Sequence, residues 1–287
     1  MKGKRGLIIL LVTTVLMLAL MAGAAYLTGG LPAGRTPSQT GGNAQRGAQQ
    51  ERQSYPIRVT DIDIETVSCG IQVVRGEVSQ IEVQLDLSAA DAQSSQLVAT
   101  QRGQSLRIEQ TFFEHDWWDW SSWGRVFDGS GDGQSQVVVT VPREWKGKTV
   151  EVSTTSGGIG VDLGSGLDKV ALEATSGSIS GVVEHTAMLE VDAVSGSTDL
   201  QGGFDEARVD TVSGSVDFAI RGAVRELKVD MVSGSLRVDT DQSEVDVSFD
   251  TVSGSLDIDP ALTQSSRAGL NLKANSVSGS VEINPLP

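Results

Sequence analysis

The side chains best suited to bind another molecule are the aromatic ones in FFEHDWWDWSSWGRVF, residues 112–127. Tryptophan rings can stack on sugars, lie in a membrane interface or contact another protein. The candidate contact residues are Trp117, Trp118, Trp120 and Trp123. The simplest alternative is structural, with the segment folding over an exposed strand edge. Glu114, Asp116 and Asp119 argue against deep insertion into lipid.

Carboxylates form a second candidate group because they recur at fixed distances from a repeated motif. Asp192, Asp210, Asp230 and Asp250 precede copies of the motif, and Asp199, Asp217 and Asp257 follow them. Stacked carboxylates repel one another unless solvent screens them or a cation bridges them. Arg237 and Glu282 interrupt the second series. We therefore favour a solvated acidic face over a cation site.

Sites for metals and for catalysis find little support. Asp128 to Gly133 matches the first half of a calcium loop, but Val139 stands where a bidentate Glu would complete it, so a turn is the better interpretation. One cysteine and two histidines cannot form a four-ligand zinc site from nitrogen and sulfur. No nucleophile elbow, zinc-protease motif, Walker loop or dinucleotide fingerprint is present. We expect no cofactor, no metal and no enzymatic activity; a pair of carboxylates that cleaves a polysaccharide in a groove is the remaining enzymatic alternative.

The charge balance excludes one class of partner. The chain of 287 residues has 37 acidic and 22 basic side chains, a net charge of -15, and no basic cluster. Binding to a nucleic-acid backbone requires clustered Lys and Arg. We therefore expect no nucleic-acid partner.

The element that must position these residues is a repeat with a period of about 20 residues. Val-Ser-Gly-Ser or a close variant of it occurs seven times, and a fixed period of this length indicates one unit stacked on its neighbours. The central glycines, which we take as the repeat-defining structural residues, are Gly157, Gly177, Gly196, Gly214, Gly234, Gly254 and Gly279.

Side-chain alternation within a repeat predicts its shape. Val209 and Thr211 share one parity, whereas Val212, Val216 and Phe218 share the other, so the inward set changes phase at a bend between two short strands. Such units predict an all-β fold, a single-stranded parallel β-helix that we expect to be right-handed. The motif glycine either leaves room inside the bend or supplies a positive φ in a turn. The same phase change places Cys69 at the glycine position of an eighth copy, as a small buried residue rather than a reactive thiol.

The N-terminal part has a different composition. Residues 6–27 are uncharged and apolar after a basic start, which predicts a transmembrane signal anchor with residues 1–5 in the cytoplasm. A cleaved signal peptide is the alternative, because Ala22-Gly23-Ala24 resembles a cleavage site. Residues 28–54 are typical of a flexible linker, and residues 55–287 form the β-solenoid domain. The only clear insertion among the repeats is 260–268.

The motifs TTSGGI at 154–159 and TVSGSV at 211–216, with VVVTVPREW before them, resemble those of a bacterial adhesin-like family of unknown function. The resemblance covers residues 55–287 and implies an extracytoplasmic β-solenoid behind a membrane anchor, with no catalytic residues. It suggests a non-catalytic surface interaction or structural module in the cell membrane, whose partner is a cell-wall glycan or an envelope protein. The alternative is an accessory component of a cell-envelope stress signalling system, which some members of the family accompany.

Overall fold

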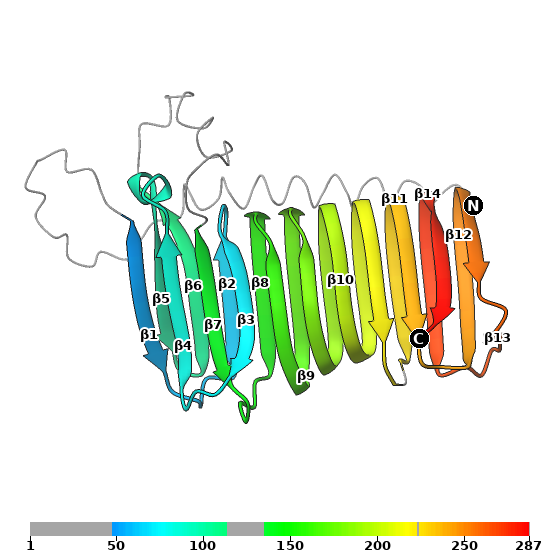
Figure 1. The fold of residues 1–287 in the computed structure, drawn as a ribbon, viewed down its shortest axis with the longest axis horizontal. Coiled ribbons are helices and arrows are strands. Elements are labelled where there is room, and N and C mark those ends of the chain that lie inside the picture. Colours follow the sequence, from blue (N-terminus) through cyan, green and yellow to red (C-terminus); the bar gives the residue numbers. More distant parts are fainter. Residues whose placement is uncertain (1–47, 114–134, 223, 287) are drawn as a thin grey trace, which may run out of the picture. The chain divides into compact units, whose positions relative to one another are not determined.

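The fold is all-β in the part of the chain that the computed structural model describes, residues 48–113, 135–222 and 224–286 (Figure 1). The only helix in these ranges is one 3-10 turn, η1 (Asp91–Gln93). The strands are β1 (Gln49–Tyr55), β2 (Asp61–Thr66), β3 (Gly70–Gly76), β4 (Ile81–Leu87), β5 (Ser95–Arg102), β6 (Ser105–Phe112), β7 (Gln136–Pro142), β8 (Thr149–Ser156), β9 (Ile159–Ser176), β10 (Ile179–Ile220), β11 (Glu226–Thr240), β12 (Glu244–Ile258), β13 (Thr263–Gln264) and β14 (Leu270–Pro285).

Most strands stack in parallel as rungs, each made of two arms that meet at a bend. In the pairing of β10 with β11, for example, Val209 lies beside Val229 in the first arm and Gly214 beside Gly234 at the bend. The same parallel pairing joins β8 to β9, β9 to β10, β11 to β14 and β12 to β14. Backbone hydrogen bonds to the rungs on both sides hold each interior rung in place. The prediction of stacked repeats is therefore confirmed.

The inward side chains change phase at each bend, as the alternation predicts. Val209 and Thr211 are buried in one first arm, and Val216 and Phe218 are buried in the second arm that follows. Phe218 packs edge-on against Phe204, with ring centroids 5.9 Å apart. The valine of the motif is an exception to the prediction, because Val212 is only half-buried. It lies at the bend, where the chain passes from one arm to the other and the side chain faces the edge of the core.

The motif glycines are required because the backbones of adjacent rungs approach closely at the bend. A Cβ on Gly214 would lie well under 3.0 Å from the carbonyl oxygen of Gly196 in the adjacent rung, and Gly214 also has φ +152°. Residues other than glycine rarely adopt this backbone conformation. The close approach and the positive φ act together at this position, so the two explanations that the sequence leaves open both hold.

Cys69 occupies the glycine position of the first rung, formed by β2 and β3, which confirms the eighth copy of the repeat. A Cβ on Gly157 would overlap the carbonyl of Cys69, just as the other glycines meet their neighbours. The hydroxyl groups of Thr66 and Thr154 donate to this carbonyl, at 3.4 and 3.3 Å. The thiol is fully buried, and burial together with the charge of Asp91 raises its pKa to about 12. Cys69 is thus a core residue and a poor nucleophile at neutral pH.

The N-terminal part of the fold corrects the prediction of a purely parallel β-helix. β1, β4 and β7 pair antiparallel, as do β5 and β6, and these strands join the parallel stack through β7 beside β3 and β6 beside β2. β1 begins at Gln49, so the first strand starts six residues before the predicted domain boundary at Tyr55. The side-chain amide of Gln49 bonds both the N–H and the carbonyl of Leu97, at 3.0 and 2.9 Å, and so joins β1 to β5.

The C-terminal rungs do not stack in the order of the sequence. β14, the last strand, lies between β11 and β12, so the order is β11, β14, β12 (Figure 1). The glycines consequently stack in the order Gly234, Gly279, Gly254. The connection that contains 260–268 carries the chain past β12 and back, which explains why Gly254 and Gly279 are 25 residues apart. The insertion is therefore a structural return segment.

Several predictions concern residues outside the described ranges. The anchor at 6–27, most of the linker at 28–54, the calcium-like turn at 128–133 and all four candidate tryptophans lie there. In the described ranges, no helix is both long and apolar enough to span a membrane. The right-handed coiling of the stack stays a prediction.

Candidate functional site

The first arms of the rungs carry a row of carboxylates on their outer face. Each member stands four residues before a motif glycine, or before Cys69, so the repeat places them all at the same height in the stack. We call this set the acidic row. It consists of Glu65, Glu173, Asp192, Asp210, Asp230 and Asp250, with Ser153 and Asn275 at the equivalent positions of two other rungs.

Strand register decides which members of the acidic row are neighbours. Glu173 lies beside Asp192, and Asp210 lies beside Asp230. Adjacent strands are about 4.8 Å apart, so these carboxylates repel one another. Asp230 and Asp250 are not adjacent, contrary to the regular series in the sequence, because Asn275 of β14 lies between them. The side-chain nitrogen of Asn275 donates to Asp230 at 2.7 Å, and Nζ of Lys228 lies 3.3 Å from the same carboxylate, so repulsion is reduced at that point.

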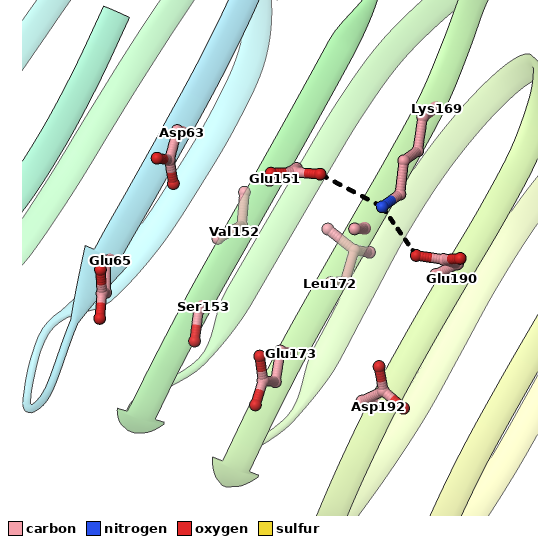
Figure 2. A pocket seen from close by; sticks show the side chains of 11 residues that line it. Asp63, Glu65, Glu151, Val152, Ser153, Lys169, Leu172, Glu173, Glu190 and Asp192 are labelled. Carbon is pink, nitrogen blue, oxygen red and sulfur yellow. Dashed lines mark hydrogen bonds and ion pairs between the residues drawn. The ribbon is translucent and has the colours of Figure 1, made fainter. Parts of the chain in front are cut away.

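A hollow on this face lies over β2, β8, β9 and β10. It is a shallow depression of about 370 Å³ lined mainly by charged side chains (Figure 2). Lys169 stands at its margin and bridges two carboxylates, with Nζ 3.2 Å from Glu151 and 2.8 Å from Glu190. These ion pairs partly offset the charges of Glu151 and Glu190 beside the acidic row. Figure 2 shows Glu65, Glu173 and Asp192 along the other side of the depression. Of these, Glu65 pairs with Arg107, whose Nη2 lies 2.8 Å from its carboxylate.

Asp192 is the most strongly perturbed carboxylate of the row. Loss of hydration raises its pKa to about 6, the nearby charges of Asp210 and Glu173 add to the effect, and Arg208 opposes it. Arg208 itself is 2.7 Å from Asp210. The Asp192 side chain is nevertheless exposed, so water weakens these interactions. At neutral pH the row carries its negative charge at some cost in electrostatic repulsion.

The other candidate residues within the described ranges lie in the second acidic series and at the bends. In the second series, Asp217 lies beside Arg237, Arg237 beside Glu282, and Glu282 beside Asp257, so Arg237 and Glu282 do interrupt it as the sequence indicates. The seven motif glycines line the bends. In the described ranges, no three His, Cys, Asp or Glu side chains converge to hold a metal ion.

Part of the site, around the first rungs of the stack, is not among the residues that the sequence predicts. Glu65 and Glu173 belong to the acidic row, and Lys169 with its two partners forms the margin of the depression. Counting back four residues from each glycine, and from Cys69, would have found both members of the row. The ion pairs of Lys169 could not be found in this way, because they run diagonally between rungs.

A profile of the family described as Toastrack DUF4097 matches residues 59–285. A search among curated proteins gave no match. Solved structures with a similar fold include a candidate adhesin from Bacteroides fragilis, with 12% identity over 83% of this chain and 97% of that chain and a TM-score of 0.40. Others are a candidate cell adhesion protein from Clostridium sporogenes (9% identity, 83% and 100%, TM-score 0.34) and a candidate lipid-binding protein from Parabacteroides distasonis (14%, 84% and 97%, TM-score 0.30). Similarities this distant carry no conclusion about function.

Proposed function

The chain belongs to the Toastrack DUF4097 family, and from this premise we propose that it is a non-catalytic, adhesin-like module that presents its stacked sheet as a contact surface. We place it outside the cytoplasmic membrane and attached by residues 6–27, an assignment that rests on the apolar composition of that segment. Its partner is a component of the cell envelope, either a glycan or a protein.

The observation that carries this proposal is the acidic row. Its members come from rungs far apart in the sequence, yet the repeat aligns them on one open face. A rigid stack holds charges at fixed intervals near 4.8 Å, which suits recognition of an extended partner better than that of a compact substrate. The wide, shallow depression on the same face supports contact rather than enclosure.

The charge of the row also restricts the partner. A surface with several adjacent carboxylates repels anionic polymers and attracts cationic groups, and at moderate salt the attraction is felt within about 8–10 Å. We therefore propose an envelope component that presents amino or guanidinium groups at intervals, such as a glycan with free amines or a protein with a basic strand or loop. Such an interaction is expected to weaken as the salt concentration rises.

Binding of the full-length chain to defined probes tests the proposal. Purified peptidoglycan, a glucosamine polymer with free amines and the same polymer after N-acetylation would be compared in a pelleting assay. We expect retention on the amine-bearing polymer and a marked loss when Asp210→Asn and Asp230→Asn are combined. The matched control is Glu144→Gln with Asp168→Asn, which removes the same charge from exposed positions outside the row.

The controls distinguish binding by the acidic row from attraction by the overall negative charge of the protein. Equal losses in the two double variants would show that overall charge is responsible, and the row would then have no special role. Equal binding of the free and acetylated polymers would contradict recognition of amino groups.

A further inference from the structure

β12 ends the stack with an edge that is open along most of its length. One side of β12 pairs with β14 from Val245 to Ile258. On the other side, within the described ranges, only β13 pairs with it, at Glu244 and Val245 (Figure 1). The backbone of residues 246–258 therefore faces away from the stack. An edge of this length is a template for another strand unless something covers it.

None of the residues in the described ranges covers the apolar core at this end. Leu256 is 38% exposed, whereas Val281 and Leu236, which occupy the same position in the next two rungs, are each 1% exposed. Val252 at the bend is 60% exposed, compared with 42% for Val277 at the same position of the interior rung β14. Val247, Phe249 and Ile258 are only partly buried against the core. β12 thus has the inward side chains of a complete rung, but in the described ranges no further rung packs against them.

We propose that a second copy of this chain covers the edge, with the two β12 rungs paired antiparallel about a two-fold axis that passes through both bends. In this arrangement the first arm of one copy lies against the second arm of the other. The contact is isologous, so the pair is closed and does not continue into a filament.

The phase change in β12 makes this rung complementary to itself. Before the bend the inward residues of β12 have odd numbers, and after the bend they have even numbers. When the first arm of one copy pairs antiparallel with the second arm of the other, every inward residue can therefore lie opposite another inward residue. With Asp250 opposite Ser255 of the second copy, Phe249 faces Leu256 and Val247 faces Ile258. Directly opposed apolar side chains of this kind stabilise an antiparallel pair.

The same alignment also avoids most repulsion between the acidic side chains of β12. Asp250 faces Ser255, and Asp257 faces Ser248, so each of these carboxylates meets a hydroxyl group rather than another charge. Asp246 opposite Asp259 is the exception, and the two-fold axis makes this contact of like charges occur twice. β13 leaves this contact free, because it occupies the edge only at Glu244 and Val245.

At the opposite end of the stack, the described strands offer no comparable bent rung. The outer strands there are β1, with the sequence QQERQSY, which pairs antiparallel with β4, and β5, which pairs antiparallel with β6; neither contains the bend of the repeat. Joining the open end of one copy to β1 of another would leave Phe249 and Leu256 facing polar side chains, and β5 could match only one arm of β12. The pairing of β12 with β12 is therefore the better match.

Sedimentation equilibrium of the full-length chain in a mild detergent tests for the pair. We expect a dimer, and we expect Leu256→Lys to weaken its association about tenfold or more, because the charge would lie in the apolar contact. Val182→Lys is the matched control, since Val182 is 37% exposed but lies in β10 away from the end. A monomer at concentrations of about 100 µM, or equal effects of the two substitutions, would overturn the proposal.

Cross-linking tests the register independently of any other contact in the chain. Asp250→Cys combined with Ser255→Cys would place two thiols opposite each other across the pair, and mild oxidation by dissolved oxygen with a copper catalyst should give a covalent dimer. Asp246→Cys with Ser255→Cys is the control, because these positions would be four residues out of register, roughly 13 Å apart. The native thiol of Cys69 is buried and does not interfere. Equal yields from the two variants would refute the register and with it the proposal.

Discussion

Substitution of Gly214 by alanine tests the idea that close approach of adjacent rungs, rather than turn formation alone, accounts for the repeated motif. The new Cβ would lie well under 3.0 Å from the carbonyl oxygen of Gly196, a distance that real Cβ atoms essentially never show. That oxygen belongs to the backbone of the next rung, which cannot move without disturbing the ladder on both sides. Gly214 also has φ +152°.

The expected magnitude follows from these two effects. Holding a residue with a side chain in such a conformation costs about 1–3 kcal/mol, and forcing an extra methyl group into a packed contact costs about 1–3 kcal/mol more. We therefore expect Gly214→Ala to lower the free energy of unfolding by about 2–6 kcal/mol. At about 2–4 °C per kcal/mol for a domain of this size, the melting temperature should fall by roughly 4–24 °C.

Two other glycines separate the contributions. Gly222 has φ +84° but no heavy atom within 4 Å of its Cβ position, so Gly222→Ala should show only the backbone cost, about 1–2 kcal/mol. Gly158 lacks a positive φ, and its Cβ would meet Ser178 Oγ at an ordinary 3.6 Å, so Gly158→Ala should be nearly neutral. Thermal unfolding by circular dichroism would rank the three variants. If Gly214→Ala were no worse than Gly222→Ala, close approach between rungs would not be the limiting constraint.

Three further substitutions test side chains of the stack. The hydroxyl of Ser276 is buried without a partner in the described ranges, so Ser276→Ala should raise stability by about 1 kcal/mol in urea unfolding, and a loss would show that the hydroxyl is satisfied. Because the pKa of Asp192 is raised to about 6, the folded state binds more protons than the unfolded state between about pH 4 and 6 and loses stability as pH rises through this window. Asp192→Asn should therefore stabilise the fold at pH 8, by less than about 1 kcal/mol given its exposure, with no gain below pH 4; a gain independent of pH would contradict this. Lys169→Gln removes the ion pairs with Glu151 and Glu190 and should lower the free energy of unfolding by up to about 1 kcal/mol at low salt. This loss should shrink in 1 M NaCl, and a loss that salt does not change would indicate that packing is responsible.

Local spacing in the sequence determined the architecture of a single rung. The period near 20 residues, the phase change at the bend and the position of Cys69 depend only on neighbours within one repeat, and the structure agrees with all three. Side-chain alternation within a strand is a short-range property, which is why it can be read without knowing the partner strand. The half-buried Val212 departs from this pattern because the bend interrupts the alternation.

The order of the rungs was decided only by the tertiary structure. The copies of the motif around Gly234, Gly254 and Gly279 are nearly identical, so each can pair with any other in the same register, and no local feature tells β14 to lie between β11 and β12. The 25-residue interval supplies enough chain for the return but does not require it. This order determines that Asn275 separates Asp230 from Asp250 and that β12, with its exposed Leu256, forms the open end. Both the acidic row and the proposed contact between copies therefore depend on long-range strand pairing. Local sequence does not determine this pairing, because the nearly identical rungs are equivalent as partners.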